Sequence, residues 1–162
     1  MDDESRLVVE RLRQTLSNLG ISAEIINHWP LSGKNSADAS RILGVRNEQI
    51  LKCLLFCSRV DCIFVAAIVN GNQQVALSKL EAISGITMLR LATPTEVKQF
   101  TGHKVGGVPP TALYGKCQVF VDQSILAQPF IIGSAGSEFV GLKLNPQDLI
   151  RLGFIPARVG AG

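Results

Sequence analysis

The chain has 162 residues, of which 46% are apolar and 18% charged, and its net charge is +3. This length suits one domain, and the apolar content supports a sizeable core, which excludes a disordered chain. The longest uninterrupted apolar run, residues 62–69, has eight residues and is too short to cross a bilayer. Because the N-terminus is acidic, unlike a secretory signal, we expect a single domain over residues 1–162 in the cytoplasm.

In chain order, Val8, Leu12, Leu16 and Leu19 are spaced as on one face of a helix that ends at Gly20. Residues 22–29 are typical of a short strand. We expect a second helix, from a cap at Ser36 to a stop at Gly44. Two apolar runs, residues 49–57 and 62–70, then predict a β-hairpin buried on both faces.

Lys52 interrupts the first strand of this hairpin, on the face shared with Leu54 and Phe56. A charge there is costly unless it has a partner or a path to water. The side chain could simply extend to the surface from the end of the strand. We favour the alternative, in which the amine points into a binding pocket.

The second half of the chain mixes the two element types. Ser78 to Glu81 predicts a capping box, and Thr93 to Glu96 combines an N-cap, a proline at N1 and a glutamate at N3. Further strands are expected at residues 87–91, 118–121, 139–144 and 154–159, with a last helix capped by Asn145. Without strict alternation of helices and strands, the pattern predicts an α+β fold with one mixed, strongly curved β-sheet flanked by short helices.

Two glycine-rich segments break this pattern. Residues 102–115 contain the pair Gly106 and Gly107, which can adopt positive φ, followed by Pro109 and Pro110, which stiffen the backbone. Such a loop is either a wide turn or a rigid display of backbone N–H groups to a ligand. Residues 133–137 are expected to form a second flexible turn.

The cysteines and histidines give no metal signature. The four cysteines show no C-x-x-C spacing and lie in apolar, strand-like segments, and only two histidines could help them bind a metal, so we expect four reduced, buried thiols, no metal and no cofactor. The residues are Cys53, Cys57, Cys62, Cys117, His28 and His103.

The charge is unevenly distributed. Residues 34–116 contain ten basic and five acidic side chains, a balance of +5, whereas the remainder carries six basic and eight acidic, or −2. A basic middle is compatible with a phosphate-bearing partner, although a solvated surface of mixed charge would show the same count.

Familiar catalytic motifs are absent from the sequence. Ala135 stands where a nucleophile elbow needs its serine, and Gly115-Lys116 lacks the rest of a P-loop. An enzyme built from these residues would act by positioning its substrate and by stabilising an oxyanion through backbone N–H groups.

Four segments in this order give the chain a family resemblance. They are Leu43-Gly44-Val45, residues 49–56, residues 101–110 and Gly133-Ser134-Ala135-Gly136. Together they resemble the YbaK/prolyl-tRNA-synthetase-associated domain family, over about residues 20–153. The resemblance is to the free-standing members, because no synthetase body is present.

The resemblance implies trans-editing, which is hydrolysis of the ester that joins a wrong amino acid to the 3′ end of tRNA. It implies catalytic roles for Lys52, Gly106 and Gly107, with Lys52 at the terminal adenosine and the loop backbone at the aminoacyl carbonyl. It implies neither a metal nor a protein nucleophile. It also implies a set of substrate-binding residues. That set is Val108, Pro109, Pro110, His103, Gly133, Ser134, Ala135 and Gly136. The implied partners are the tRNA 3′ end and, where one delivers the substrate, an aminoacyl-tRNA synthetase, with no membrane involved.

One departure concerns the amino acid that is removed. Some cysteine-clearing members carry an acid at the position of Gly141, and the nearest acid here is Glu138. Alanine, cysteine, serine and threonine therefore stay open as substrates. His103 either helps this choice or caps the preceding helix. The same fold could also serve a non-catalytic module that binds tRNA, a nucleotide or a partner protein, or a small-molecule esterase.

Overall fold

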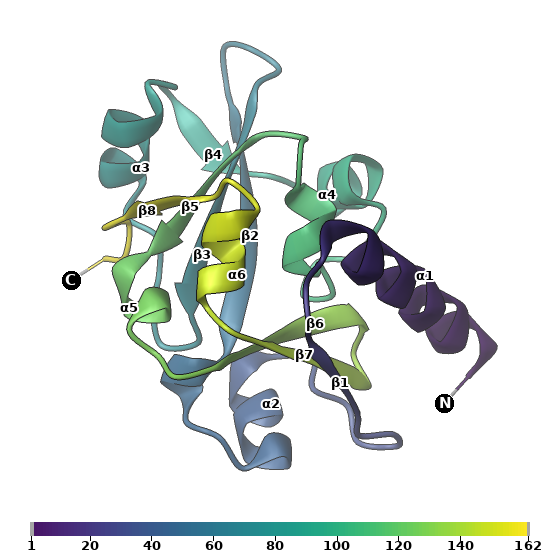
Figure 1. Ribbon diagram of the computed structural model, residues 1–162. Helices are drawn as coiled ribbons and strands as arrows, with labels where there is room; N and C mark the ends of the chain where they lie inside the picture. The colour runs from purple at the N-terminus through teal and green to yellow at the C-terminus, as the bar shows by residue number, and fades with distance from the viewer. Residues whose placement is uncertain (1, 162) are drawn as a thin grey trace.

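Two β-sheets and the helices around them form the fold in this computed structural model, which describes residues 2–161 (Figure 1). The helices are α1 (Asp3–Leu19), α2 (Ser36–Leu43), α3 (Leu77–Ser84), α4 (Pro94–Thr101), α5 (Gln123–Leu126) and α6 (Gln147–Arg151), with 3-10 turns at Asn47–Gln49 and Pro110–Leu113. The strands are β1 (Glu24–Asn27), β2 (Leu51–Ser58), β3 (Phe64–Asn70), β4 (Leu89–Leu91), β5 (Gln118–Asp122), β6 (Ile131–Ser137), β7 (Val140–Leu144) and β8 (Ile155–Ala157).

The larger sheet has the order β4-β2-β3-β5-β8, and the smaller one the order β1-β7-β6. In the larger sheet β2 and β3 form the predicted antiparallel hairpin, whereas β5 and β8 add as parallel strands. The α+β class and the mixed sheet are therefore confirmed. The strands divide into two sheets, however, which a single parallel bridge between Ile50 and Ile132 connects.

Glycines end four of the helices as expected from the sequence. Gly20, Gly44, Gly85 and Gly102 all adopt positive φ and donate their N–H groups back into the helix that precedes them. The capping box between Thr93 and Glu96 is also confirmed, with hydrogen bonds in both directions.

Two predicted helix starts are wrong, one by a single residue and one by two residues. Asn35, rather than Ser36, caps α2 through its side-chain oxygen, which accepts the N–H of Asp38 at 2.8 Å. The α3 helix begins at Leu77 with Ala76 as its N-cap, so Ser78 forms no capping box. The reason is tertiary, because the Ala76 N–H pairs with the carbonyl of Val159 far along the chain and fixes where the helix starts.

The second glycine-rich segment is a strand and not the expected flexible turn. Residues 131–137 form β6 and pair with β7, with a register shift between Ser134 and Ser137. Gly136, at φ 96°, accommodates this irregularity. The chain reverses one step later, at Glu138 and Phe139.

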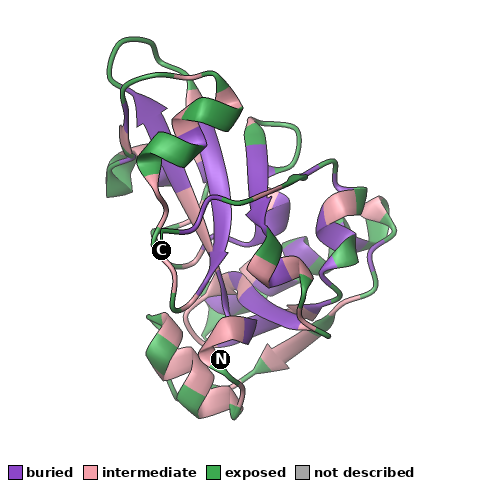
Figure 2. Cartoon of the chain, turned by 90° about the vertical axis from the view of Figure 1, so that its left-hand side faces the viewer, coloured by how far each residue is buried: buried purple, intermediate pink, exposed green. Residues whose placement is uncertain are grey.

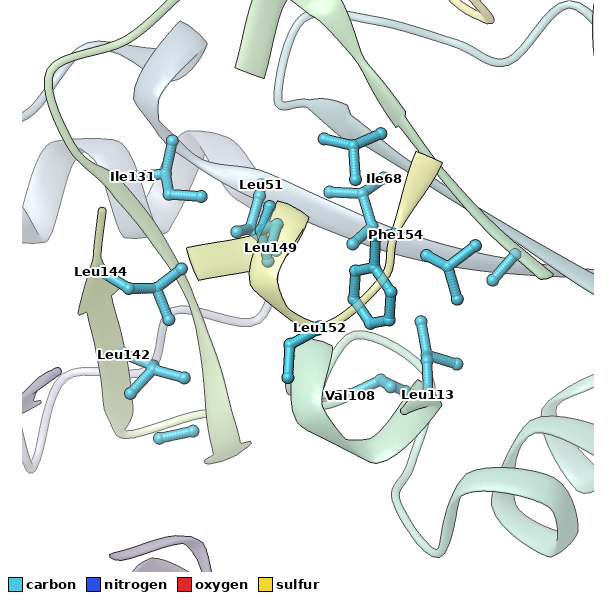
Figure 3. Close-up of a cluster of buried hydrophobic side chains, with 14 of the residues drawn as sticks. Leu51, Ile68, Val108, Leu113, Ile131, Leu142, Leu144, Leu149, Leu152 and Phe154 are labelled. Atoms are coloured by element: carbon cyan, nitrogen blue, oxygen red, sulfur yellow. The ribbon is translucent and has the colours of Figure 1, made fainter. Parts of the chain in front are cut away.

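The core fills both faces of the larger sheet, whose central strands are buried (Figure 2). On one face, side chains of β2, β3 and β5 pack with those of β6, β7 and α6 (Figure 3). On the other face, Phe56, Val65 and Phe120 pack with Leu80 of α3. No helix within residues 2–161 has the length and apolar character that a membrane crossing requires.

The cysteines are free thiols, but their burial differs from the prediction. Cys57 is buried, and Cys53 and Cys117 pack against the core, where burial raises their pKa values to about 12 and about 11. Cys62 is exposed. The prediction of burial is wrong there because β3 begins only at Phe64, which leaves Cys62 in the turn that follows β2.

Candidate functional site

A cavity of about 720 Å³ lies where the two sheets separate. Its floor is β2, which contributes residues 51–55 to the lining. The neighbouring strand β4 pairs with only residues 56–58 of β2, so residues 52–54 have a strand partner on the β3 side alone. Backbone N–H and C=O groups on the other edge of β2 are therefore available to a ligand.

Lys52 lies on this floor and is only partly exposed. Its ammonium group donates a hydrogen bond of 2.5 Å to the backbone carbonyl of Gln73, in the loop that follows β3. Burial lowers the pKa of Lys52 below its ordinary value of 10.5. This hydrogen bond therefore holds the amine at the cavity floor, and the side chain does not extend to open solvent.

The residue that holds Lys52 is itself anchored in a buried polar network. The side chain of Gln73 donates to Asp122 at 3.0 Å and accepts hydrogen bonds from Asn70 and Ser124. The other carboxylate oxygen of Asp122 accepts the N–H groups of Val159 and Gly160 at 2.9 and 3.0 Å. Three segments distant in sequence, residues 70–73, 122–124 and 159–160, therefore meet behind Lys52.

Asp122 is an ionised carboxylate that accepts most of the hydrogen bonds of this network. Burial alone would raise its pKa, but hydrogen bonds from the side chains of Gln73 and Ser124 and from the Gly160 amide outweigh that effect. They hold the pKa of Asp122 at about 2, below the ordinary value of 3.8. Its stabilising contribution is therefore complete above about pH 4 and is lost as the pH falls through about 2.

We expect Asp122→Asn to lower the free energy of unfolding by about 2 kcal/mol at pH 7. The new amide would face the donors of Gln73 and Ser124, and the charge would be lost. Urea unfolding of both proteins at pH 7 and near pH 2 measures the effect. The difference between them should shrink at the lower pH, and an equal difference at both values would contradict the assigned role.

The glycine–proline loop forms a second wall of the cavity through Val105, Gly106 and Val108. A tight turn shapes it, in which the Gly107 N–H donates to the carbonyl of Lys104 at 2.9 Å and Gly106 adopts φ 82°. Within residues 2–161, the N–H groups of Gly106 and Val108 donate to no protein acceptor. They are loop amides that remain for a ligand, whereas that of Gly107 is bonded within the turn.

The far end of this loop is fixed in the core. Val108 and Leu113 are buried among the apolar side chains of the core (Figure 3). Pro109 has the extended backbone expected before a proline, with φ −70° and ψ 149°, and Pro110 starts a 3-10 turn. The loop is therefore anchored at one end and held by a glycine turn at the other.

Strand β6 forms the third wall, through Gly133 and Ser134. A Cβ on Gly133 would lie 2.8 Å from the Cδ1 of Leu51, so only glycine lets β6 approach β2 this closely. Gly136 lies behind this wall, where a Cβ would lie 3.1 Å from the His103 ring and 2.3 Å from Val8 of α1.

The structure thus brings some of the predicted residues together and sets others behind them. Lys52, Gly106, Val108, Gly133 and Ser134 line the one cavity. The other predicted residues do not line it but support the two glycine-rich walls. They are Gly107, Pro109, Pro110, His103, Ala135 and Gly136.

His103 is half-buried between the glycine–proline loop and β6. Burial, followed by the charges of Lys98 and Lys116, lowers its pKa. Capping of α4 was the alternative role for His103, but the C-cap is Gly102, whose N–H donates to the carbonyl of Lys98 at 2.9 Å. His103 therefore lies between the two walls without lining the cavity.

Sequence reasoning missed one polar rim of the cavity, formed by Lys34, Asn35, Ser137 and Glu138. The Glu138 carboxylate accepts a hydrogen bond from Ser32 and lies 3.8 Å from the Lys34 ammonium. The sequence singled out Glu138 only as the acid nearest to Gly141 and the loop before α2 only as polar, because no local signal pairs that loop with the β6–β7 turn. Gly141 also lines the cavity, so the position where this chain lacks the acid of some cysteine-clearing members lies within the site.

Comparison with known proteins gives consistent matches. Residues 32–152 match the family model of the aminoacyl-tRNA editing domain. The chain is 38% identical over 105 residues to a proline–tRNA ligase of Nitratidesulfovibrio vulgaris, a match that covers 64% of this chain and 18% of the ligase. It is 26% identical over 129 residues to the uncharacterized protein YwhH of Bacillus subtilis, covering 80% of this chain and 81% of YwhH.

Solved structures show the same fold. A candidate trans-editing enzyme for prolyl tRNA synthetase superposes with a TM-score of 0.85 at 26% identity, over 96% of this chain and 98% of that one. By contrast, the chain spans less than a fifth of the length of the proline–tRNA ligase that it matches.

Proposed function

We propose that this chain, which belongs to the aminoacyl-tRNA editing domain family, hydrolyses the ester between tRNA and a wrongly attached small amino acid. The reaction would consume water and release the free amino acid and a tRNA with a free 3′ hydroxyl. Alanine, cysteine, serine and threonine are the candidate amino acids, and the cytoplasm, where charged tRNA is used, is the expected location.

One observation carries the proposal. An amine on the floor, unpaired loop amides on one wall and a glycine-lined strand on another surround a single cavity. In this arrangement the ammonium of Lys52 would contact the terminal ribose and adenosine. The amides of Gly106 and Val108 would donate to the carbonyl oxygen of the ester as it gains negative charge.

The rim would hold the amino-acid end of the substrate. The Glu138 carboxylate lines the cavity and could pair with the α-ammonium group of the aminoacyl moiety. Apolar side chains such as Leu51, Val97 and Val140 line the remaining space, which suits a small side chain. Water would attack the carbonyl, the bond to the 3′ oxygen would break, and the proton would pass to that oxygen.

A deacylation screen tests this proposal directly. Alanyl-, cysteinyl-, seryl- and threonyl-tRNA would each be incubated with the protein, with correctly charged prolyl-tRNA as the control. We expect at least one mischarged tRNA to be cleaved many times faster than in buffer, and prolyl-tRNA to be spared. The reaction should need no added synthetase.

If the screen fails, two other functions of the same fold remain, and further measurements distinguish them. If tRNA binds with strong salt dependence but no ester is cleaved faster than in buffer, the protein is a binding module. If aminoacyl esters without RNA are cleaved as fast as the tRNA esters, it is a small-molecule esterase.

A further inference from the structure

One long stretch of the chain carries positive charge without any compensating acid. Residues 97–121 contain three lysines and one histidine but no aspartate or glutamate. This stretch includes the last residues of α4, the glycine–proline loop and most of β5. Within residues 2–161, none of the salt bridges involves these three lysines.

The fold gathers these lysines at the end of α4. The Lys98 ammonium donates to the carbonyl of Gly102 at 3.1 Å, and that of Lys116, from a different segment, donates to the carbonyl of Phe100 at 3.0 Å. Lys104 follows two residues after Gly102, and all three lysines are exposed. We call Lys98, Lys104, Lys116 and the neighbouring Tyr114 the basic face.

Helix capping explains only part of this arrangement. A lysine near a helix C-terminus satisfies a free carbonyl and interacts with the helix dipole. One hydrogen bond uses one of three N–H donors, so Lys98 and Lys116 keep donors and charge for a partner. Tyr114 adds an aromatic ring that is 48% exposed, a surface on which a base can stack.

The basic face continues into the lip of the cavity. Lys104 starts the turn that contains Gly106, and Val105 between them is 58% exposed. The opposite lip is also close, because a Cβ on Gly106 would lie 3.4 Å from the carbonyl oxygen of Lys34. A chain that leaves the cavity past Gly106 therefore meets Lys104 first.

We propose that the basic face binds the phosphate backbone of the RNA strand whose 3′ end occupies the cavity. The proposal rests on the proposed function for the identity of the ligand, since an ester at an RNA 3′ end places phosphates just outside the cavity. Exposed ammonium groups that form no salt bridge attract phosphates through a salt-dependent interaction. Tyr114 stacks on an unpaired base of the same strand.

The test uses the triple variant Lys98→Gln/Lys104→Gln/Lys116→Gln and two forms of the substrate. On intact mischarged tRNA we expect KM to rise about tenfold or more, with kcat within about twofold of the original protein. On the corresponding aminoacyl-adenosine, which lacks the RNA body, both constants should stay the same. The slope of log K against log salt for binding uncharged tRNA should fall by about 2.

Two controls separate the proposal from simpler effects. The double variant Lys79→Gln/Arg158→Gln removes positive charge from α3 and from the residue after β8, on the other side of the molecule from α4 (Figure 1). It should leave KM and the salt slope unchanged. Replacing the three lysines of the basic face by arginine keeps the charge and should keep binding, and thermal unfolding checks that each variant is folded.

Tyr114→Leu isolates the stacking contribution. We expect it to weaken tRNA binding about fivefold or more without changing the salt slope, because it removes a ring and no charge. The proposal is overturned if the basic-face triple variant keeps the original salt slope, or if the control double variant loses as much binding for each charge removed. Binding of uncharged tRNA tests the basic face even if no ester is cleaved. A wrong proposal for the basic face can therefore be distinguished from a wrong proposal for the deacylase activity.

Discussion

Replacing Lys52 by alanine should lower deacylation of the mischarged substrate by about 100-fold or more while leaving the protein folded. In the proposed complex its ammonium donates to the terminal ribose and adenosine in a partly desolvated cavity, where losing a charged hydrogen-bond partner costs about 3 kcal/mol in kcat/KM. The measurement is kcat/KM on the best substrate from the screen. Thermal unfolding is the accompanying check on the fold.

The burial of Lys52 suggests a second substitution that tests the role of its amine. Burial disfavours its charged form, so Lys52→Met, which keeps the aliphatic stem but loses the hydrogen bond to the Gln73 carbonyl, should remain folded. Lys143→Met on β7 is the matched control, because that ammonium lies outside the cavity and 4.5 Å from the Phe130 ring centroid. Full turnover by the Lys52→Met variant would exclude a role for the amine.

The same environment gives a pH dependence. Because the pKa of Lys52 is lowered, the amine loses its proton at a lower pH than an ordinary lysine with a pKa of 10.5. Binding of a non-hydrolysable substrate analogue should therefore weaken, as the pH rises, before the pH reaches 10.5. Binding by Lys52→Arg should not weaken over this range, since a guanidinium keeps its charge.

Replacing Gly106 by alanine should have the second large effect. At φ 82° an L-residue is strained by about 1–2 kcal/mol, and the turn would shift to relieve the strain. The amides of Gly106 and Val108 would then move away from the ester carbonyl. We expect kcat to fall about tenfold or more, because small displacements of oxyanion donors are costly.

Gly107→Ala is the matched control for this change. Gly107 lacks the positive φ of its neighbour, and a Cβ there would meet the Lys104 carbonyl at 3.4 Å, an ordinary contact. Its N–H is already bonded within the turn. Its kcat should therefore fall much less than that of Gly106→Ala, and equal losses in the two variants would argue against the geometry proposed for the loop.

Local signals predicted the elements that depend on few neighbours. The β2–β3 hairpin followed from two apolar runs, and the α4 cap from three residues between Thr93 and Glu96. The predictions failed where distant segments decide. The start of α3 depends on Val159, and the segment with Gly133 is a strand because β7 pairs with it.

By itself, the sequence determined an α+β chain with a lysine in a buried strand and a stiff glycine–proline loop. Periodicity, capping residues and backbone restrictions are local properties, so they can be read from neighbouring residues. Only the tertiary structure decided that the free edge of β2, the loop at Gly106 and strand β6 enclose one cavity, with Glu138 on its rim and Asp122 behind its lysine. Those contacts join residues far apart in the chain, and their geometry is set by packing between the two sheets.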